Sequence, residues 1–89
     1  MARVRAKVSG RVQGVSFRAA TVEEARRRGL VGWVKNEDDG DVLLEAQGSS
    51  EAIAALLAWC RKGPPGARVI AVQTEVVPET TDTSFRVRF

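Results

Sequence analysis

The chain has 89 residues, of which 44% are hydrophobic and 28% charged, and its formal net charge is +3. This length suits one small domain, residues 1–89, and the composition is that of a globular protein rather than a disordered or fibrous one. The chain contains no histidine. That absence excludes Ser-His-Asp and Cys-His catalysis, phosphohistidine intermediates and histidine-ligated metals.

The sequence also indicates where the protein acts. No apolar run approaches the roughly 18 residues that cross a bilayer, and the N-terminus lacks the apolar core of a signal peptide. The single cysteine, Cys60, suits a reducing compartment. We therefore expect a cytoplasmic protein with no membrane partner, and a monomer by default. The only basic run, residues 26–28, follows two glutamates at helical spacing, so we interpret it as a solvated helix face.

The first half of the chain alternates between strand and helix patterns. Residues 3–9 alternate apolar and polar side chains, which predicts a half-buried strand. Residues 15–28 predict a helix that ends at Gly29. Residues 30–36 and 41–47 read as two strands, and Asp39-Gly40 between them is a strong hairpin signal.

The second half begins with a helix that Ser49 or Ser50 caps. Its apolar stripe consists of Ile53, Leu56, Leu57 and Cys60, with Trp59 at the edge. Residues 62–66 end this helix, and residues 68–77 form a strand whose inward-facing phase the pattern leaves open. After a turn at residues 78–83, the last strand directs Phe85, Val87 and Phe89 inward.

The order of these elements predicts the fold class. It is β-α-β-β-α-β with a short terminal strand, which favours a ferredoxin-like α/β sandwich of the α+β class. We expect a five-stranded, mainly antiparallel sheet with both helices on one face.

The stretch GRVQGVSFR, residues 10–18, crosses the junction between the first strand and the first helix. Backbone amides at a helix N-terminus lack intrahelical partners and carry the positive end of the helix dipole. Gly10 and Gly14 would let such amides converge on an anion, and Arg18 adds a planar cation that can hold two phosphate oxygens. The alternative is ordinary turn chemistry around two glycines.

Asn36 is the only asparagine in the chain and lies near the end of a predicted strand. Its side chain either makes a local backbone hydrogen bond or orients a water molecule beside the neighbouring loop. The acidic residues at 37–41 resemble a calcium loop only superficially, because Lys35 and Ala46 occupy its first and twelfth positions. We interpret them as a solvated hairpin tip and expect no metal site.

Two motifs together resemble the acylphosphatase family. Its first signature, G-[RK]-V-Q-G-V-x-[FY]-R, is met by Gly10, Arg11, Val12, Gln13, Gly14, Val15, Phe17 and Arg18. Its second, G-[WF]-V-x-N-x-x-[DN]-G-x-V-x-x-x-x-x-G, is met by Gly32, Trp33, Val34, Asn36, Asp39, Gly40, Val42 and Gly48. The motifs occur in the family's order, and with the matching length and element order the resemblance covers the whole chain.

The resemblance implies a hydrolase that splits acyl phosphates into carboxylate and inorganic phosphate without a metal or other cofactor. It assigns phosphate binding to the backbone amides of Gly14, Val15, Ser16, Phe17 and Arg18 and to the Arg18 guanidinium. It assigns Asn36 the role of orienting the attacking water. Ser16 stands at a variable motif position and is not a nucleophile. The sequence does not identify the acyl group or the acceptor of the water's proton.

The alternative function is a non-catalytic module that binds an anion or RNA on the same fold. RNA-recognition sheets present stacking aromatic side chains on their exposed face. This chain has no tyrosine, and Phe85 and Phe89 are predicted to face inward. We therefore expect no nucleic-acid partner.

Overall fold

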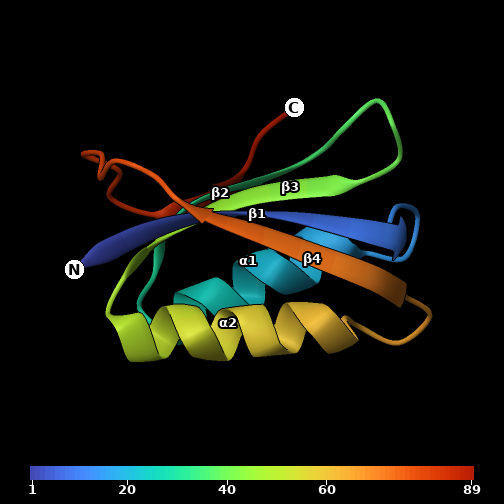
Figure 1. Ribbon diagram of the computed structural model, residues 1–89, viewed down its shortest axis with the longest axis horizontal. Helices are drawn as coiled ribbons and strands as arrows, with labels where there is room; N and C mark the ends of the chain where they lie inside the picture. Colours follow the sequence, from blue (N-terminus) through green and yellow to red (C-terminus); the bar gives the residue numbers. More distant parts are fainter.

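A five-stranded sheet forms one layer of the structure and two helices form the other (Figure 1). The computed structural model describes residues 1–89. The elements in chain order are β1 (Ala2–Arg11), α1 (Phe17–Arg27), β2 (Val31–Asn36), β3 (Val42–Gly48), α2 (Ser50–Lys62), β4 (Arg68–Val76) and β5 (Phe85–Val87). The strand order is β4-β1-β3-β2-β5, and only the β2–β5 pair is parallel. The predicted ferredoxin-like α+β fold is confirmed.

The hydrophobic core lies between the sheet and the helices. Alternation along β1 places Ala6 and Val8 on the helix-covered face, where both are fully buried. From α2, Ile53, Leu56 and Cys60 enter the same core, as the stripe predicted. Burial raises the pKa of the Cys60 thiol to about 12, so this side chain is a packing group and not a thiolate nucleophile. No helix is long and apolar enough to span a membrane.

The ends of both helices follow the predicted signals. The amides of Gly29 and Leu30 donate to carbonyl oxygens in the last turn of α1, at 3.1 and 3.0 Å, which is the Schellman arrangement. Glu24 pairs with both Arg27 and Arg28 at 3.2 and 3.1 Å, so the basic run belongs to a salt-bridged helix end. Ser49 caps α2, and its hydroxyl oxygen accepts from the Ala52 amide at 3.1 Å.

The inward phase of β4, which the sequence left open, is set by a bulge. Ser9 pairs with Ala71 and Gly10 pairs with Val69, so one extra residue, Ile70, lies between those partners. The bulge lets Val69 and Val72, three positions apart, both pack against the core. Strict alternation could not assign both to one face.

The expectation that Phe89 faces inward is wrong. Phe85 is fully buried and Val87 packs against the core, but β5 ends at Val87 and Phe89 is fully exposed. Val87 lies beside Val34, which is the last buried residue of β2. A side chain two positions further along therefore has no core to enter.

Residues 77–84 form a long connection that is bonded to the sheet, and not only a turn. They connect β4 at one edge of the sheet to β5 at the other edge (Figure 1). Thr80 and Asp82 accept hydrogen bonds from Arg3 at 3.0 and 2.9 Å, and the Thr80 amide donates to Gln47 at 2.8 Å. These contacts hold the connection against the sheet, and they explain why Arg3, on the polar face of β1, is buried.

Candidate active site

The loop between β1 and α1 contacts the β2–β3 hairpin, and both lie at the same end of the molecule (Figure 1). The side-chain amide of Gln13 donates to the carbonyl oxygens of Glu37 and Asp41, at 2.8 and 3.0 Å. Asn36, the last residue of β2, directly precedes Glu37. The two sequence motifs, far apart along the chain, therefore meet at one site. Gln13 belongs to the first motif, but no local pattern in the sequence indicates this role.

The two glycines of the loop are required for different reasons. Gly10 has a φ of 124°, and a Cβ there would overlap the carbonyl oxygen of Arg68 in β4 and lie 2.9 Å from the Ile70 amide nitrogen. Gly14 has a φ of 75°, but a Cβ there would meet nothing within 4 Å. Gly10 thus permits a close approach between strands, whereas Gly14 supplies a left-handed turn.

The N-terminus of α1 has no side-chain cap. Ser16 stands at the cap position with a left-handed backbone, φ 60° and ψ 27°, and its hydroxyl makes no capping bond. The first hydrogen bond at this end joins the Ala20 amide to the Ser16 carbonyl oxygen at 3.0 Å. The amides of Gly14, Val15 and Ser16 donate to no other group of the protein. The loop and first turn therefore offer several backbone donors to an external acceptor.

The charges at this helix end also favour an anion. The first turn of α1 contains no acidic residue, whereas Glu51 occupies the first turn of α2. Arg18 lies in that first turn of α1 and is half-buried. A cation at the positive end of a helix dipole is unfavourable by itself, and a bound anion would reverse that effect. Phe17 is buried and packs on Trp59, with 5.5 Å between ring centroids, so only its backbone could contribute to binding.

Arg18 and Asn36 both lie near the same aromatic ring, that of Phe89. The Arg18 guanidinium carbon is 5.6 Å from the centroid of the Phe89 ring. Phe89 also lines a surface hollow together with Asn36 and residues 35 and 37–39. The structure therefore brings the predicted phosphate ligand and the predicted water-orienting amide to one region. Sequence reasoning missed Phe89, because the alternation of the last six residues assigned it to the core.

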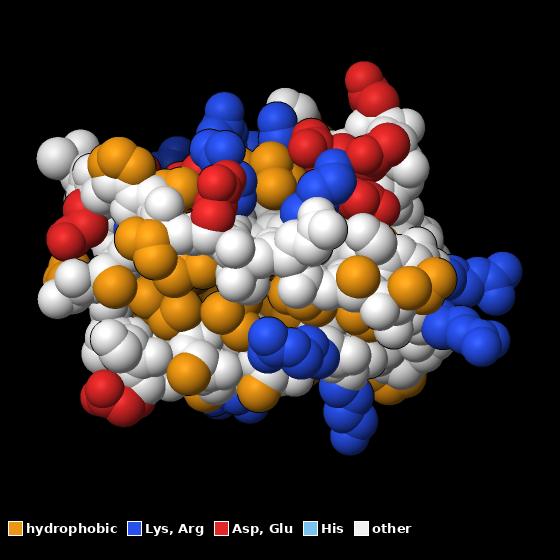
Figure 2. All heavy atoms as spheres, in the orientation of Figure 1, with side chains coloured by type: hydrophobic (Ala, Val, Ile, Leu, Met, Phe, Trp, Pro, Cys, Tyr) orange, Lys and Arg blue, Asp and Glu red, His pale blue; other side chains and the backbone are white.

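The acidic residues of the hairpin surround a lysine. The Lys7 ammonium lies 2.8 Å from Asp39, 3.5 Å from Asp41 and 3.9 Å from Glu37. The hydrogen bond to Lys7 lowers the pKa of the Asp39 carboxyl below its usual range. Figure 2 shows acidic and basic side chains gathered where Figure 1 draws the end of the β2–β3 hairpin. No group of three or more carboxylate, cysteine or histidine side chains is arranged to hold a metal ion.

Comparison with known proteins identifies relatives along the whole chain. The acylphosphatase family model matches residues 4–87. An acylphosphatase from Anaeromyxobacter dehalogenans is 50% identical over 90 residues, covering 98% of this chain and 97% of the relative. The structure of an acylphosphatase from Coxiella burnetii matches with a TM-score of 0.95 and 41% identity, covering 98% of this chain and 92% of the other. The acylphosphatase from Bacillus subtilis matches with a TM-score of 0.96 and 34% identity over the full length of both chains.

Proposed function

The chain belongs to the acylphosphatase family and is an acyl-phosphate hydrolase, and from this premise we propose how its own residues act. The amides of Gly14 to Arg18 and the Arg18 guanidinium bind the phosphate group of the substrate. The side-chain amide of Asn36 orients a water molecule toward the phosphorus. Attack by this water forms a new P–O bond and breaks the bond between phosphorus and the acyl oxygen, which releases carboxylate and inorganic phosphate.

The observation that carries this proposal is the N-terminus of α1, which is uncapped and has a cation in its first turn. A phosphate there would accept hydrogen bonds from amides that have no partner in the protein. Arg18 would add two charge-assisted hydrogen bonds in a fixed plane. The carboxylate is a good leaving group, so positioning and charge stabilisation supply most of the catalysis.

Asn36 suits the second role because its amide both donates and accepts hydrogen bonds. It lines an exposed hollow that water can enter, beside the loop that Gln13 ties down. The neighbouring carboxylate of Asp39 is already engaged by Lys7 at 2.8 Å. We therefore assign the water's proton to an oxygen of the bound phosphate rather than to a protein side chain.

The same proposal covers the domain organisation, oligomeric state, cellular location and metal requirement of the protein. We propose a single domain over residues 1–89 that acts as a monomer in the cytoplasm without a metal. The Lys7 ammonium supports the metal-independent reaction, because it occupies the centre of the one acidic cluster near the site.

Benzoyl phosphate hydrolysis in the presence of a chelator tests the assignment. We expect the parent protein to be active and Arg18→Gln to lose more than about 10³-fold in kcat. Removing one donor aimed at developing charge costs roughly 10²–10³-fold, and Arg18 supplies a charge and two donors. Asn36→Ala should lose roughly 10²-fold in kcat with a smaller change in KM, because it acts on water and not on the substrate.

The controls match each variant. Arg27→Gln removes an exposed arginine from the same helix, and Gln73→Ala removes an exposed amide from β4; both should retain parental rates. Asp39→Asn should keep most of the turnover if the phosphate takes the proton. Circular dichroism verifies that every variant is folded. Parental rates in folded Arg18→Gln or Asn36→Ala would contradict the assigned roles, and a collapse in Asp39→Asn would contradict the assigned proton acceptor.

A further inference from the structure

Phe89 is a fully exposed aromatic ring at the edge of the proposed site. Isolated surface apolar side chains are ordinary, but this ring contacts the phosphate ligand Arg18 and lines the hollow of Asn36. The mechanism above does not use it. The residues assigned to phosphate binding do not contact the acyl group, and the position of Phe89 makes it a candidate for that contact.

The backbone next to Phe89 is fixed. Val87 pairs with Val34 in the parallel β2–β5 ladder, and the Arg88 amide donates to the Val34 carbonyl oxygen at 2.8 Å. The Arg88 guanidinium also lies over the Trp33 ring, 4.6 Å from its centroid. These contacts with β2 hold Arg88, the residue before Phe89, so the ring projects from a defined point beside Arg18.

The Arg18 guanidinium can bind phosphate and contact the Phe89 ring at the same time. A guanidinium binds phosphate through N–H groups in its own plane, and its contact with an aromatic ring uses the face of the ring. The two contacts are therefore compatible. In an acyl phosphate the acyl carbon is separated from phosphorus by one oxygen, so the acyl group must lie within a few ångström of a phosphate held by Arg18. Among the residues that line the hollow of Asn36, Phe89 is the one with an apolar side chain.

We propose that Phe89 forms the acyl subsite and favours substrates with aromatic or extended apolar acyl groups over those with small acyl groups. This inference rests on the phosphate-binding role assigned to Arg18. Because the ring is exposed, it covers one side of the acyl group and leaves the other in water. An aromatic pair of this kind accounts for about a three- to tenfold preference.

Two pairs of ligands test the subsite. The first pair is benzoyl phosphate and acetyl phosphate, compared by kcat/KM. The second pair is benzylphosphonate and methylphosphonate, which are not hydrolysed and are compared by calorimetric Kd. In Phe89→Ala we expect kcat/KM for benzoyl phosphate to fall about fivefold while the value for acetyl phosphate stays within twofold. The preference for benzylphosphonate should shrink by the same factor. Phe89→Leu should restore part of it.

The outcomes separate the possible roles. Val76→Ala, an exposed apolar residue that pairs with Val4 at the other end of the sheet, should change neither ratio. Equal losses for both substrates in Phe89→Ala would overturn the subsite, because the ring would then only position Arg18. Unchanged ratios would overturn it too. A parent that hydrolyses neither substrate but binds benzylphosphonate in a Phe89-dependent manner would refute the proposed function and support the subsite.

Discussion

At the scale of single residues, the loop after β1 depends on two glycines that the sequence could not tell apart. Both have positive φ, but only Gly10 lies against backbone, because a Cβ added there would overlap the Arg68 carbonyl oxygen. We expect Gly14→Ala to lower the free energy of unfolding by about 1 kcal/mol, the cost of a left-handed alanine. Gly10→Ala should lower the free energy of unfolding by about 3 kcal/mol or more, because β4 must also move away from the added methyl group.

Urea unfolding of the two variants measures this difference directly, and each variant serves as the reference for the other. Benzoyl phosphate hydrolysis should follow the same order, since a displaced β4 also displaces the strand that leads into the loop. Equal destabilisation by the two substitutions would show that β4 accommodates the added carbon, and that the contact between Gly10 and Arg68 does not restrict the loop.

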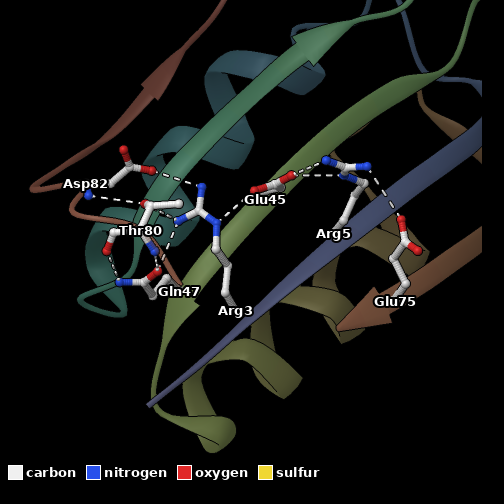
Figure 3. Close-up of polar contacts among 7 residues, drawn as sticks. All are labelled: Arg3, Arg5, Glu45, Gln47, Glu75, Thr80 and Asp82. Atoms are coloured by element: carbon white, nitrogen blue, oxygen red, sulfur yellow. Dashed lines mark hydrogen bonds and ion pairs between the residues drawn. The ribbon is translucent and has the colours of Figure 1, made fainter. Parts of the chain in front are cut away.

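At the scale of elements, a buried ion pair joins β1 to β3 on the polar face of the sheet (Figure 3). Arg3 donates to Glu45 at 2.7 Å, and Arg5 contacts the other carboxylate oxygen at 2.6 Å. Glu45→Gln leaves the buried guanidinium of Arg3 with Asp82 as its only charged partner. Removing one member of a buried pair is strongly destabilising, so we expect a loss of about 3 kcal/mol in the free energy of unfolding.

The matched control is Glu75→Gln. Glu75 contacts Arg5 at 3.6 Å but is largely exposed, so its removal should change the free energy of unfolding by less than about 0.5 kcal/mol. Thermal or urea unfolding at neutral pH compares the two variants. If both are equally mild, the contacts of Arg3 with Thr80, Gln47 and Asp82 are sufficient without Glu45.

The same pair makes stability depend on pH. Burial alone would raise the pKa of Glu45, but the hydrogen bonds from Arg3 and Arg5 outweigh it and lower this pKa below the ordinary value of 4.5. The folded state therefore favours the carboxylate, and its stabilising effect is present above pH 4.5 and is lost as the pH falls below that value. The melting temperature of Glu45→Gln should consequently vary less with pH than that of the parent in this acidic range.

Local sequence patterns predicted the helices and strands well, because the ends of these elements depend on residues that are close together in the chain. The cap at Ser49, the helix end at Gly29 and the hairpin at Asp39-Gly40 each follow from the preference of one or two side chains. Long-range features were not predictable in this way. The bulge at Ile70 arises from the pairing of two strands about 60 residues apart along the chain. The exposure of Phe89 depends on where β2 leaves the core, and the contact between Gln13 and the hairpin appears only in three dimensions.

At the scale of the whole molecule, the two faces of the sheet differ. Helices cover one face, and a band of apolar atoms is visible between the sheet and α2 (Figure 2). The other face carries charged side chains, most of which are paired. Arg3, Arg5, Lys7 and Lys35 all lie within 4 Å of acidic partners. Arg86 and Arg88 at one edge of this face, and the cross-strand neighbours Arg11 and Arg68 at the end of β1 and the start of β4, have none. These unpaired arginines lie in different parts of the sheet, so the net charge of +3 is not concentrated into a strong basic field.

The polar face of the sheet is poorly suited to bind RNA, the alternative ligand. Trp33 lies on the exposed face of the sheet, but the Arg88 guanidinium covers its ring, 4.6 Å from the centroid. With so few unpaired arginines near Trp33, few phosphates could be neutralised, and binding to single strands should be weak and weakly salt-dependent. In a filter-binding assay we expect no saturation by single-stranded RNA at micromolar protein and physiological salt. If RNA instead binds saturably and Trp33→Ala abolishes that binding, the polar face is an RNA-binding surface. A base stacked on Trp33 would then have displaced Arg88 from the ring.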